Sequence, residues 1–289
     1  MTIRFAELIR GFSKRNENEA PPAGLLLWSD PVKQLECYYA PFEYLNEGAR
    51  IVLVGITPGR TQMNLGVEAA RTALLADQPV DAALREMKRK ASFGGDMRRP
   101  LVRMLDLFGY AGQLGIPTTE HLWGSANHLV HFCSLLKYPV FLGGKDYNGK
   151  PNMLRHPQLN QLLRQQFVSD IAQLPVDAIL VPLGEAVLEV IVKLKDEGLV
   201  PQGLLRWEGR EVALPHPAGG NGESIALALQ ERFPSLDEYV ESQWRKYIQS
   251  ESWKNKGRKE PQDETGYKTR RQKYWERLRA TRLAHGLSA

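Results

Sequence analysis

Short apolar runs alternate with longer amphipathic stretches along most of this chain. The clearest run covers residues 51–54, Ile-Val-Leu-Val, and stops at Gly55. A continuous apolar run that ends in a Gly- or Pro-rich turn is typical of a parallel strand buried on both faces. Similar runs at 129–136, 177–182 and 211–214 predict three further strands.

Between these runs, apolar residues recur at helical spacing. The predicted helices cover residues 3–12, 65–75, 80–90, 101–108, 159–174, 185–195 and 268–283. Strands that alternate with helices pack as a mostly parallel sheet with helices on both faces. We therefore expect an α/β fold, a three-layer sandwich with a central, mostly parallel four-stranded sheet flanked by helices.

The chain divides into three parts. Residues 1–45 hold a helix and an aromatic segment that we expect to pack on the core. Residues 46–240 contain all four predicted strands and form the main domain. Residues 241–289 form a basic, aromatic-containing helical extension, with thirteen Lys and Arg against six Asp and Glu.

That extension carries the basic excess of the chain, whose net charge is +5. Its aromatic residues are Trp244, Tyr247, Trp253, Tyr267, Tyr274 and Trp275. Basic residues interleaved with aromatics suit a polyanion such as nucleic acid. A solvated basic helix, or a helix that packs on the main domain, explains the same pattern.

The amino-acid composition excludes several classes of protein and of site. The 289 residues are 43% hydrophobic and 25% charged, as in ordinary globular proteins. No run reaches the roughly 18 apolar residues of a membrane span, and the N-terminus lacks an apolar signal region, so we expect a cytoplasmic protein. Two distant cysteines, Cys37 and Cys133, exclude a disulfide framework and a four-cysteine metal site or iron–sulfur cluster within this chain. We expect no cofactor and no metal.

Unusual loops follow the predicted strands. They cover residues 55–59, 134–139 and 215–222 and are rich in Gly, Pro, Ser and His. Ligands of parallel sheets bind outside the carboxyl ends of the strands. These loops should therefore converge on one site.

These loops also resemble motifs of the uracil-DNA glycosylase superfamily. Gly55-Ile56-Thr57-Pro58-Gly59 is similar to its first motif, which is Gly-Ile-Asn-Pro-Gly in the mismatch-specific branch and Gly-Glu-Ala-Pro-Gly in the iron–sulfur branch. The other similar segments are Ser92-Phe93-Gly94-Gly95 with the helix after it, residues 134–139, Pro182-Leu183-Gly184 with Ala186, and His216-Pro217-Ala218. Each motif is weak alone, but five occur in order between residues 51 and 222.

The resemblance implies two catalytic residues. Thr57 stands where most of the superfamily has Asp or Asn to hold a water, although a threonine hydroxyl cannot be a strong base. His216 would donate a hydrogen bond to the base carbonyl that gains charge. The alternatives are a threonine that satisfies its own turn and a loop histidine without a role.

The resemblance also implies a base-binding set. Phe93 would stack on an extruded base, and Ser134 would replace the Asn that reads a pyrimidine edge. Gly59 stands where strict uracil enzymes have a tyrosine that excludes a C5 substituent, so the pocket should be open there. Gly55, Ile56 and Pro58 complete this set.

DNA contacts are expected from residues close to the loops. These are Arg60, Gln62, Lys137, Gly219 and Asn221. A solvated surface explains each of them equally well.

The expected function is that of a monofunctional DNA glycosylase. It would flip a pyrimidine, uracil or a C5-modified and possibly phage-type base, out of DNA and hydrolyse its N-glycosidic bond to leave an abasic site. The role would be base excision repair or anti-phage defence, with DNA as partner and a monomer as the working form. The alternative is a catalytically degenerate relative that only binds DNA or a nucleotide.

Overall fold

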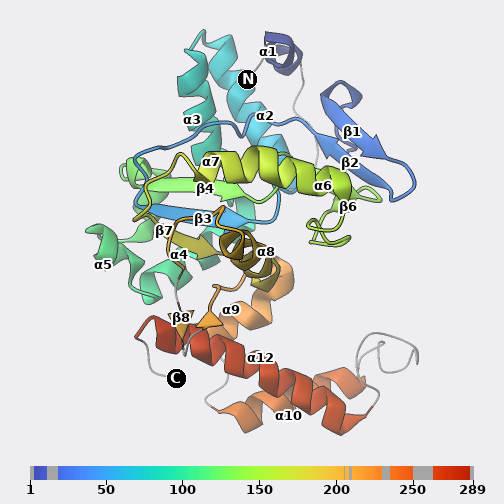
Figure 1. Ribbon diagram of the computed structural model, residues 1–289, viewed down its shortest axis with the longest axis vertical. Coiled ribbons are helices and arrows are strands. Elements are labelled where there is room, and N and C mark those ends of the chain that lie inside the picture. The colour runs from blue at the N-terminus through green and yellow to red at the C-terminus, as the bar shows by residue number, and fades with distance from the viewer. Residues whose placement is uncertain are drawn as a thin grey trace.

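The computed structural model describes residues 3–11, 19–204, 206–207, 210–229, 235–249 and 263–286. Its centre is a three-stranded parallel sheet in the order β4-β3-β7 (Figure 1). The strands are β3 (Ile51–Gly55), β4 (Val130–Ser134) and β7 (Ile179–Pro182). The apolar run at 51–54 lies in the middle strand, whose five residues are all buried.

Alternate residues of β3 point into two different cores. Val52 and Val54 belong to a cluster with apolar residues of α6, α7 and α8, whereas Ile51 and Leu53 pack with α4, α5 and α9. The helices of these two layers are α4 (Arg98–Leu107), α5 (Tyr110–Leu114), α6 (Pro157–Leu162), α7 (Ser169–Ile171), α8 (Glu185–Asp196) and α9 (Gly222–Ala228). A π-helical stretch, Leu163–Val168, joins α6 to α7. The α/β class with helices on both faces of the sheet is therefore confirmed.

The prediction of one central four-stranded sheet is wrong. The predicted strand at 211–214 contributes only a single parallel bridge, Leu183 to Leu214, beside the end of β7. A separate antiparallel sheet has the order β1-β2-β5-β6. Its strands are β1 (Leu26–Asp30), β2 (Leu35–Tyr38), β5 (Val140–Leu142) and β6 (Lys145–Asp146), none of which was predicted.

Three helices cover the side of the molecule near this second sheet. They are α1 (Ile3–Arg10), α2 (Arg60–Leu75) and α3 (Val80–Ala91). Their apolar residues form a third core with Tyr38, Tyr39 and Phe42. Ile9 of α1 belongs to this cluster together with these aromatic residues.

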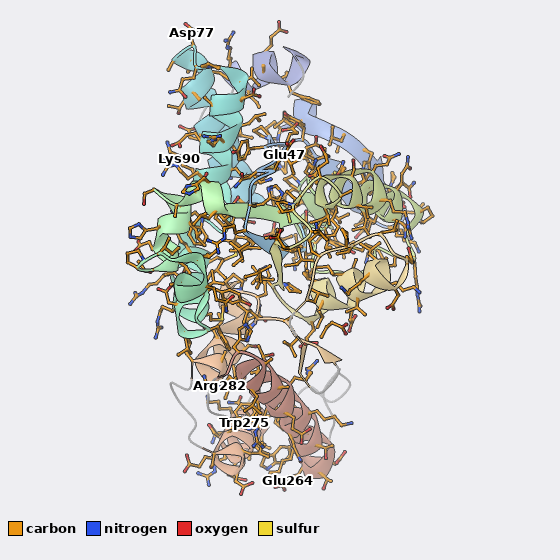
Figure 2. The ribbon with its side chains drawn as sticks, turned by 60° about the vertical axis from the view of Figure 1, so that its left-hand side comes forward. Glu47, Asp77, Lys90, Glu264, Trp275 and Arg282 are labelled. Atoms are coloured by element: carbon orange, nitrogen blue, oxygen red, sulfur yellow. The ribbon has the colours of Figure 1, made fainter. Side chains whose placement is uncertain are left out.

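Two further helices form the far end of the molecule, α10 (Leu236–Gln249) and α12 (Glu264–Ala284). Glu264, Trp275 and Arg282 follow one another along α12, and Arg282 lies nearest the main body (Figure 2). The boundary predicted between residues 240 and 241 falls inside α10. The short remaining elements are η1 (Ala23–Leu25), η2 (Gly95–Met97), η3 (Thr119–Trp123), η4 (Asn127–Leu129), η6 (Gly219–Asn221), β8 (Arg206–Trp207) and β9 (Arg210–Glu211).

Candidate active site

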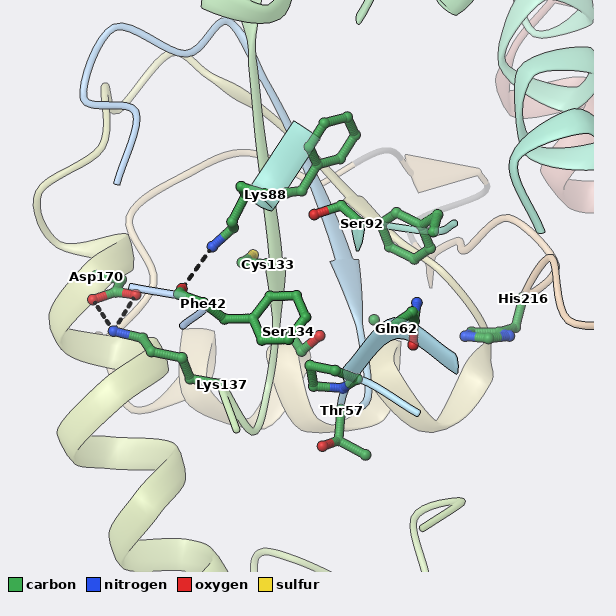
Figure 3. A pocket seen from close by; sticks show the side chains of 14 residues that line it. Phe42, Thr57, Gln62, Lys88, Ser92, Cys133, Ser134, Lys137, Asp170 and His216 are labelled. Carbon is green, nitrogen blue, oxygen red and sulfur yellow. Dashed lines mark hydrogen bonds and ion pairs between the residues drawn. The ribbon is translucent and has the colours of Figure 1, made fainter. Parts of the chain in front are cut away.

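A pocket opens where the parallel strands end. Gly55 and Ser134 are the last residues of β3 and β4, and they are direct partners in the parallel register. Segments that lie far apart in the sequence line this pocket together (Figure 3). The lining residues that were predicted are Gly55, Thr57, Pro58, Gln62, Phe93, Ser134, Lys137 and His216. The predicted loops therefore meet at one site.

The Thr57 hydroxyl is engaged with the protein backbone. Its Oγ1 donates to the Tyr138 carbonyl over 2.9 Å and accepts the Val140 N–H over 3.2 Å. These bonds connect the loop after β3 to the start of β5. The hydroxyl thus serves a structural purpose, and its catalytic role stays a prediction.

Gly59 faces a carboxylate. A Cβ built on Gly59 would overlap Asp146 Oδ2 and lie 3.1 Å from its Cγ. Asp146 Oδ1 also accepts the N–H of Arg60, the first residue of α2, over 3.0 Å. The space that Gly59 was expected to leave for a C5 substituent is filled by Asp146, and Gly59 does not line the pocket.

Ile56 was also predicted to bind the base, but it does not line the pocket and packs against the hydrophobic core. Its side chain packs against the cluster under β3, and its carbonyl accepts the Leu136 N–H over 2.9 Å.

Phe93 forms one wall of the pocket in an unusual backbone conformation. Its φ is 48°, and a bulky residue at positive φ costs about 1–3 kcal/mol. Its ring is 5% exposed and meets Phe132 edge to face, with 6.1 Å between centroids. Phe132 in turn stacks on Trp123. This row of aromatic rings holds Phe93 rigidly against the pocket.

Ser134 offers a hydroxyl beside that wall. A Cβ on Gly55 would lie 3.5 Å from the Phe93 ring and 3.6 Å from Ser134 Oγ, so a larger residue at 55 would narrow this part of the pocket. Among the described residues, Ser134 Oγ has no hydrogen-bond partner. It is therefore free to bind a ligand.

His216 stands at one end of the pocket, with its ring directed inward (Figure 3). Burial lowers the pKa of His216, which keeps the ring neutral at pH 7. Nδ1 accepts the Ala218 N–H over 3.3 Å, so the proton of the neutral ring resides on Nε2. Behind it, Gly184 at φ 97° leaves only 3.4 Å between its Cβ position and the His216 Cβ. The result is a positioned, uncharged N–H donor.

The opposite end of the pocket carries charge, and two of its three charged residues, Lys88 and Asp170, were not predicted. Lys88 from α3 and Asp170 from α7 line it together with Lys137, which forms an ion pair with Asp170 over 2.8 Å (Figure 3). Phe42, Ser92, Phe132 and Cys133 complete the lining.

Lys88 had a detectable sequence signal. It shares a helix face with Leu84, Met87 and Ala91, which are all buried. A lysine inside an apolar stripe is anomalous. Asp170 gives a weaker signal of the same kind, because it follows the buried Phe167 by three residues.

Two predicted DNA contacts are engaged within the protein. Arg60 donates to the carbonyls of Glu19 and Gly144 and lies over the Phe141 ring, and Lys137 pairs with Asp170. Arg60 is half-buried and the Lys137 side chain is 16% exposed, and DNA binding by them stays a prediction.

The other three predicted DNA contacts are Gln62, Gly219 and Asn221. Gln62 Oε1 accepts the Gly59 N–H over 2.6 Å and lines the pocket. Gly219 and Asn221 lie in η6, which leads into α9.

The described helices of the basic extension, α10 and α12, make aromatic contacts with each other and polar contacts with the main domain. The Tyr247 ring stacks on Tyr267 at 4.4 Å, and the Trp275 ring lies 5.4 Å from Tyr239. Lys268, Arg271 and Arg277 have acidic partners within 4 Å, and Arg282 donates to the Ala228 carbonyl. Lys273 and Arg279 remain exposed on α12. Trp253 lies outside the described residues, as does the side chain of Tyr274.

The described residues match neither the pattern of a metal-ligand cluster nor that of a membrane-spanning helix. They contain no group of three His, Cys, Asp or Glu side chains suited to hold a metal ion. None of the described helices combines the length and the apolar composition that a membrane-spanning helix needs.

The chain is similar in sequence to a bacterial protein. Over 228 residues the chain is 33% identical to YoxB of Bacillus subtilis (strain 168), described as an uncharacterized protein. The alignment covers 76% of this chain and 85% of YoxB. No protein-family model matches the chain, and no solved structure matches it.

Proposed function

We propose that this chain, which belongs to the same family as Bacillus subtilis YoxB, is a DNA glycosylase of the uracil-DNA glycosylase superfamily. The YoxB name assigns no activity, so the proposal rests on the pocket. The substrate would be DNA that contains uracil or a C5-modified pyrimidine, and the product would be an abasic site.

One observation carries the proposal. Segments chosen by their likeness to superfamily motifs, at residues 55–59, 92–95, 134–139 and 216–218, all supply side chains to one pocket. Gly184 of the remaining motif packs behind His216. Such convergence is what a slot for an extruded nucleobase requires.

The residues of this slot suit cleavage of an N-glycosidic bond. Departure of the base leaves positive charge on the sugar and negative charge on the base. The neutral His216 would donate Nε2–H to a base carbonyl as that charge develops, which is the kind of preorganised stabilisation that lowers the barrier most. Phe93 would stack on the base, and Ser134 would contact its edge.

Among the described residues that line the pocket, none near His216 offers a free side chain that could activate a water as a general base. The Thr57 hydroxyl is bound to Tyr138 and Val140, and Asp170 lies at the end of the pocket away from His216 (Figure 3). A mechanism in which the base departs early produces an oxocarbenium-like sugar, which water attacks without a strong base. The engaged hydroxyl is also the observation that favours the alternative, a relative that binds DNA without cleaving it.

A duplex panel tests the proposal. Purified protein is incubated with duplexes that contain uracil, a thymine mismatch, hydroxymethylcytosine or its glucosylated form, and abasic sites are detected by alkaline strand cleavage. We expect release of at least one base, and His216→Ala should lower kcat by about 100- to 1000-fold, the cost of one lost donor. His128→Ala is the matched control, because His128 is exposed and does not line the pocket.

Two results would contradict the proposal. The first is binding of these duplexes without release of any base, which would support the binding relative instead. The second is base release that His216→Ala leaves intact, because the pocket would then not be the site of cleavage.

A further inference from the structure

The pocket is asymmetric in charge. His216 at one end is neutral, whereas Lys88, Lys137 and Asp170 gather at the other end (Figure 3). These three are the only charged side chains that line it among the described residues. Burying a charged group costs free energy unless it is paired or hydrogen-bonded. Three charged groups at the end of a pocket therefore suggest that they bind part of a ligand.

Lys88 is the most deeply buried of the three. It is 5% exposed, and its ammonium donates to the Phe42 carbonyl over 2.9 Å and to the Tyr44 carbonyl over 3.2 Å. Burial lowers its pKa to about 8, so the group is still mostly charged at pH 7. An ammonium has three N–H donors. These two bonds leave one donor for a ligand.

Lys137 and Asp170 offer the complementary chemistry. Their side chains are only 16% and 17% exposed, and the lysine Nζ lies 2.9 Å from Asp170 Oδ1 and 2.8 Å from Oδ2. A carboxylate can accept further hydrogen bonds beyond this pair. The far end of the pocket thus presents donors and an acceptor side by side.

This combination selects among ligand groups. A hydroxyl can accept from an ammonium and donate to the carboxylate at the same time. An anionic group would pair with the two ammoniums but could not donate a hydrogen bond to Asp170, and a methyl group would displace water from the charged groups without replacing its hydrogen bonds. A hydroxylated group is therefore the best match.

The position of that group on the base follows from ring geometry. In a pyrimidine, C5 lies directly across the ring from C2. A base whose C2 carbonyl accepts from His216, with its face on Phe93, directs C5 toward the opposite end of the pocket. That end is formed by Lys88, Lys137 and Asp170 (Figure 3).

We propose that Lys88, Lys137 and Asp170 form a specificity subsite for a hydroxylated substituent at C5 of the extruded pyrimidine. This inference rests on the proposed glycosylase function. It makes the hydroxyl-bearing base the preferred substrate, ahead of the base with hydrogen or methyl at C5.

The test compares three duplexes that differ only at C5 of one base. They contain uracil, thymine or 5-hydroxymethyluracil opposite the same partner, and kcat/KM for base release is measured for each. We expect the hydroxymethyl base to exceed the methyl base by at least tenfold. A fourth duplex with glucosylated hydroxymethylcytosine asks whether a larger hydroxylated group also fits.

Variants assign the preference to these residues. Asp170→Asn keeps the shape of the side chain, and Lys137→Met removes one charge; each should lower the hydroxymethyl-to-methyl ratio at least fivefold. The ratio is taken within each variant, so a partial loss of folded protein cancels. Lys90→Met is the matched control, because Lys90 lies on α3 two residues from Lys88, with its side chain 49% exposed and paired with Glu86. It should leave the ratio unchanged.

The outcomes separate the two claims. Base release with no hydroxymethyl preference, or with a ratio that Asp170→Asn and Lys137→Met leave unchanged, overturns the subsite and leaves the glycosylase function standing. Release of no base from any duplex overturns both.

Discussion

Gly59 and Asp146 provide a sharp test of how the first loop is built. Gly59 has φ −82° and ψ −179°, values that alanine adopts without strain. Any cost of Gly59→Ala must therefore come from neighbours or from helix capping. The neighbour is Asp146, whose carboxylate occupies the place of the new Cβ.

The expected magnitude follows from these contacts. The methyl group must push Asp146 aside, which breaks its 3.0 Å bond to the Arg60 N–H at the start of α2. Loss of such a capping bond costs about 0.5–2 kcal/mol. Gly59→Ala should thus lower the free energy of unfolding by about 1–2 kcal/mol, and Asp146→Ala by about 1 kcal/mol.

The double variant is decisive. Once Asp146 is alanine, the space beside Gly59 is open, and Gly59→Ala should change stability by no more than about 0.5 kcal/mol further. The assay is equilibrium urea unfolding of the four proteins. Gly220→Ala is the control, since nothing lies within 4 Å of its Cβ position. If the double variant loses as much unfolding free energy as the two single variants together, the packing argument is refuted.

Three other outcomes are expected. Thr57→Val should lower unfolding stability by about 1–3 kcal/mol, because the Tyr138 carbonyl and Val140 N–H lose their partner, whereas Thr57→Ser should not; equal urea midpoints for the two variants would remove the structural role. Burial holds the pKa of His131 well below its usual range, so unfolding stability should fall as pH drops below about 6.5, by up to about 2 kcal/mol from this residue at pH 5. His131→Leu should show a smaller difference between pH 7.5 and pH 5 in urea titrations, and an unchanged difference would contradict the assignment. Phe93→Leu should lower kcat/KM for base release roughly 5- to 100-fold if stacking is worth about 1–3 kcal/mol, and wild-type kinetics would exclude stacking.

The central sheet could be predicted because its signal is local. The residues of β3 are buried on both faces, so an unbroken apolar run marks the strand regardless of its partners. The antiparallel sheet gave no such signal. Leu26 and Leu27 of β1 are partly exposed, and β2 pairs with β5 about a hundred residues further along the chain. Pairing at that separation is decided by the tertiary structure.

The candidate site likewise contains residues that the sequence could predict and residues that it could not. Gly55 and Ser134 end two neighbouring parallel strands, whose ends lie side by side, and His216 follows the single bridge that Leu214 makes beside β7. Lys88 and Asp170 come from helices, whose approach to the pocket depends on packing against the sheet. Phe93 was identified by resemblance, but its positive φ and the aromatic row behind it could only be seen in three dimensions.

The π-helical stretch at Leu163–Val168 sets the direction in which Asp170, the acidic residue of the pocket, leaves the helix. A π-turn accommodates one more residue than the α-helical turn it replaces. Removing that residue would rotate everything after it by about 100° around the helix axis. Asp170 comes two residues after this stretch, so a homologue with an uninterrupted α-helix would aim a different side chain at Lys137. In the proposed subsite, a single codon gained or lost here would replace the hydrogen-bond acceptor for the C5 substituent, while the sheet and the histidine loop stay as they are.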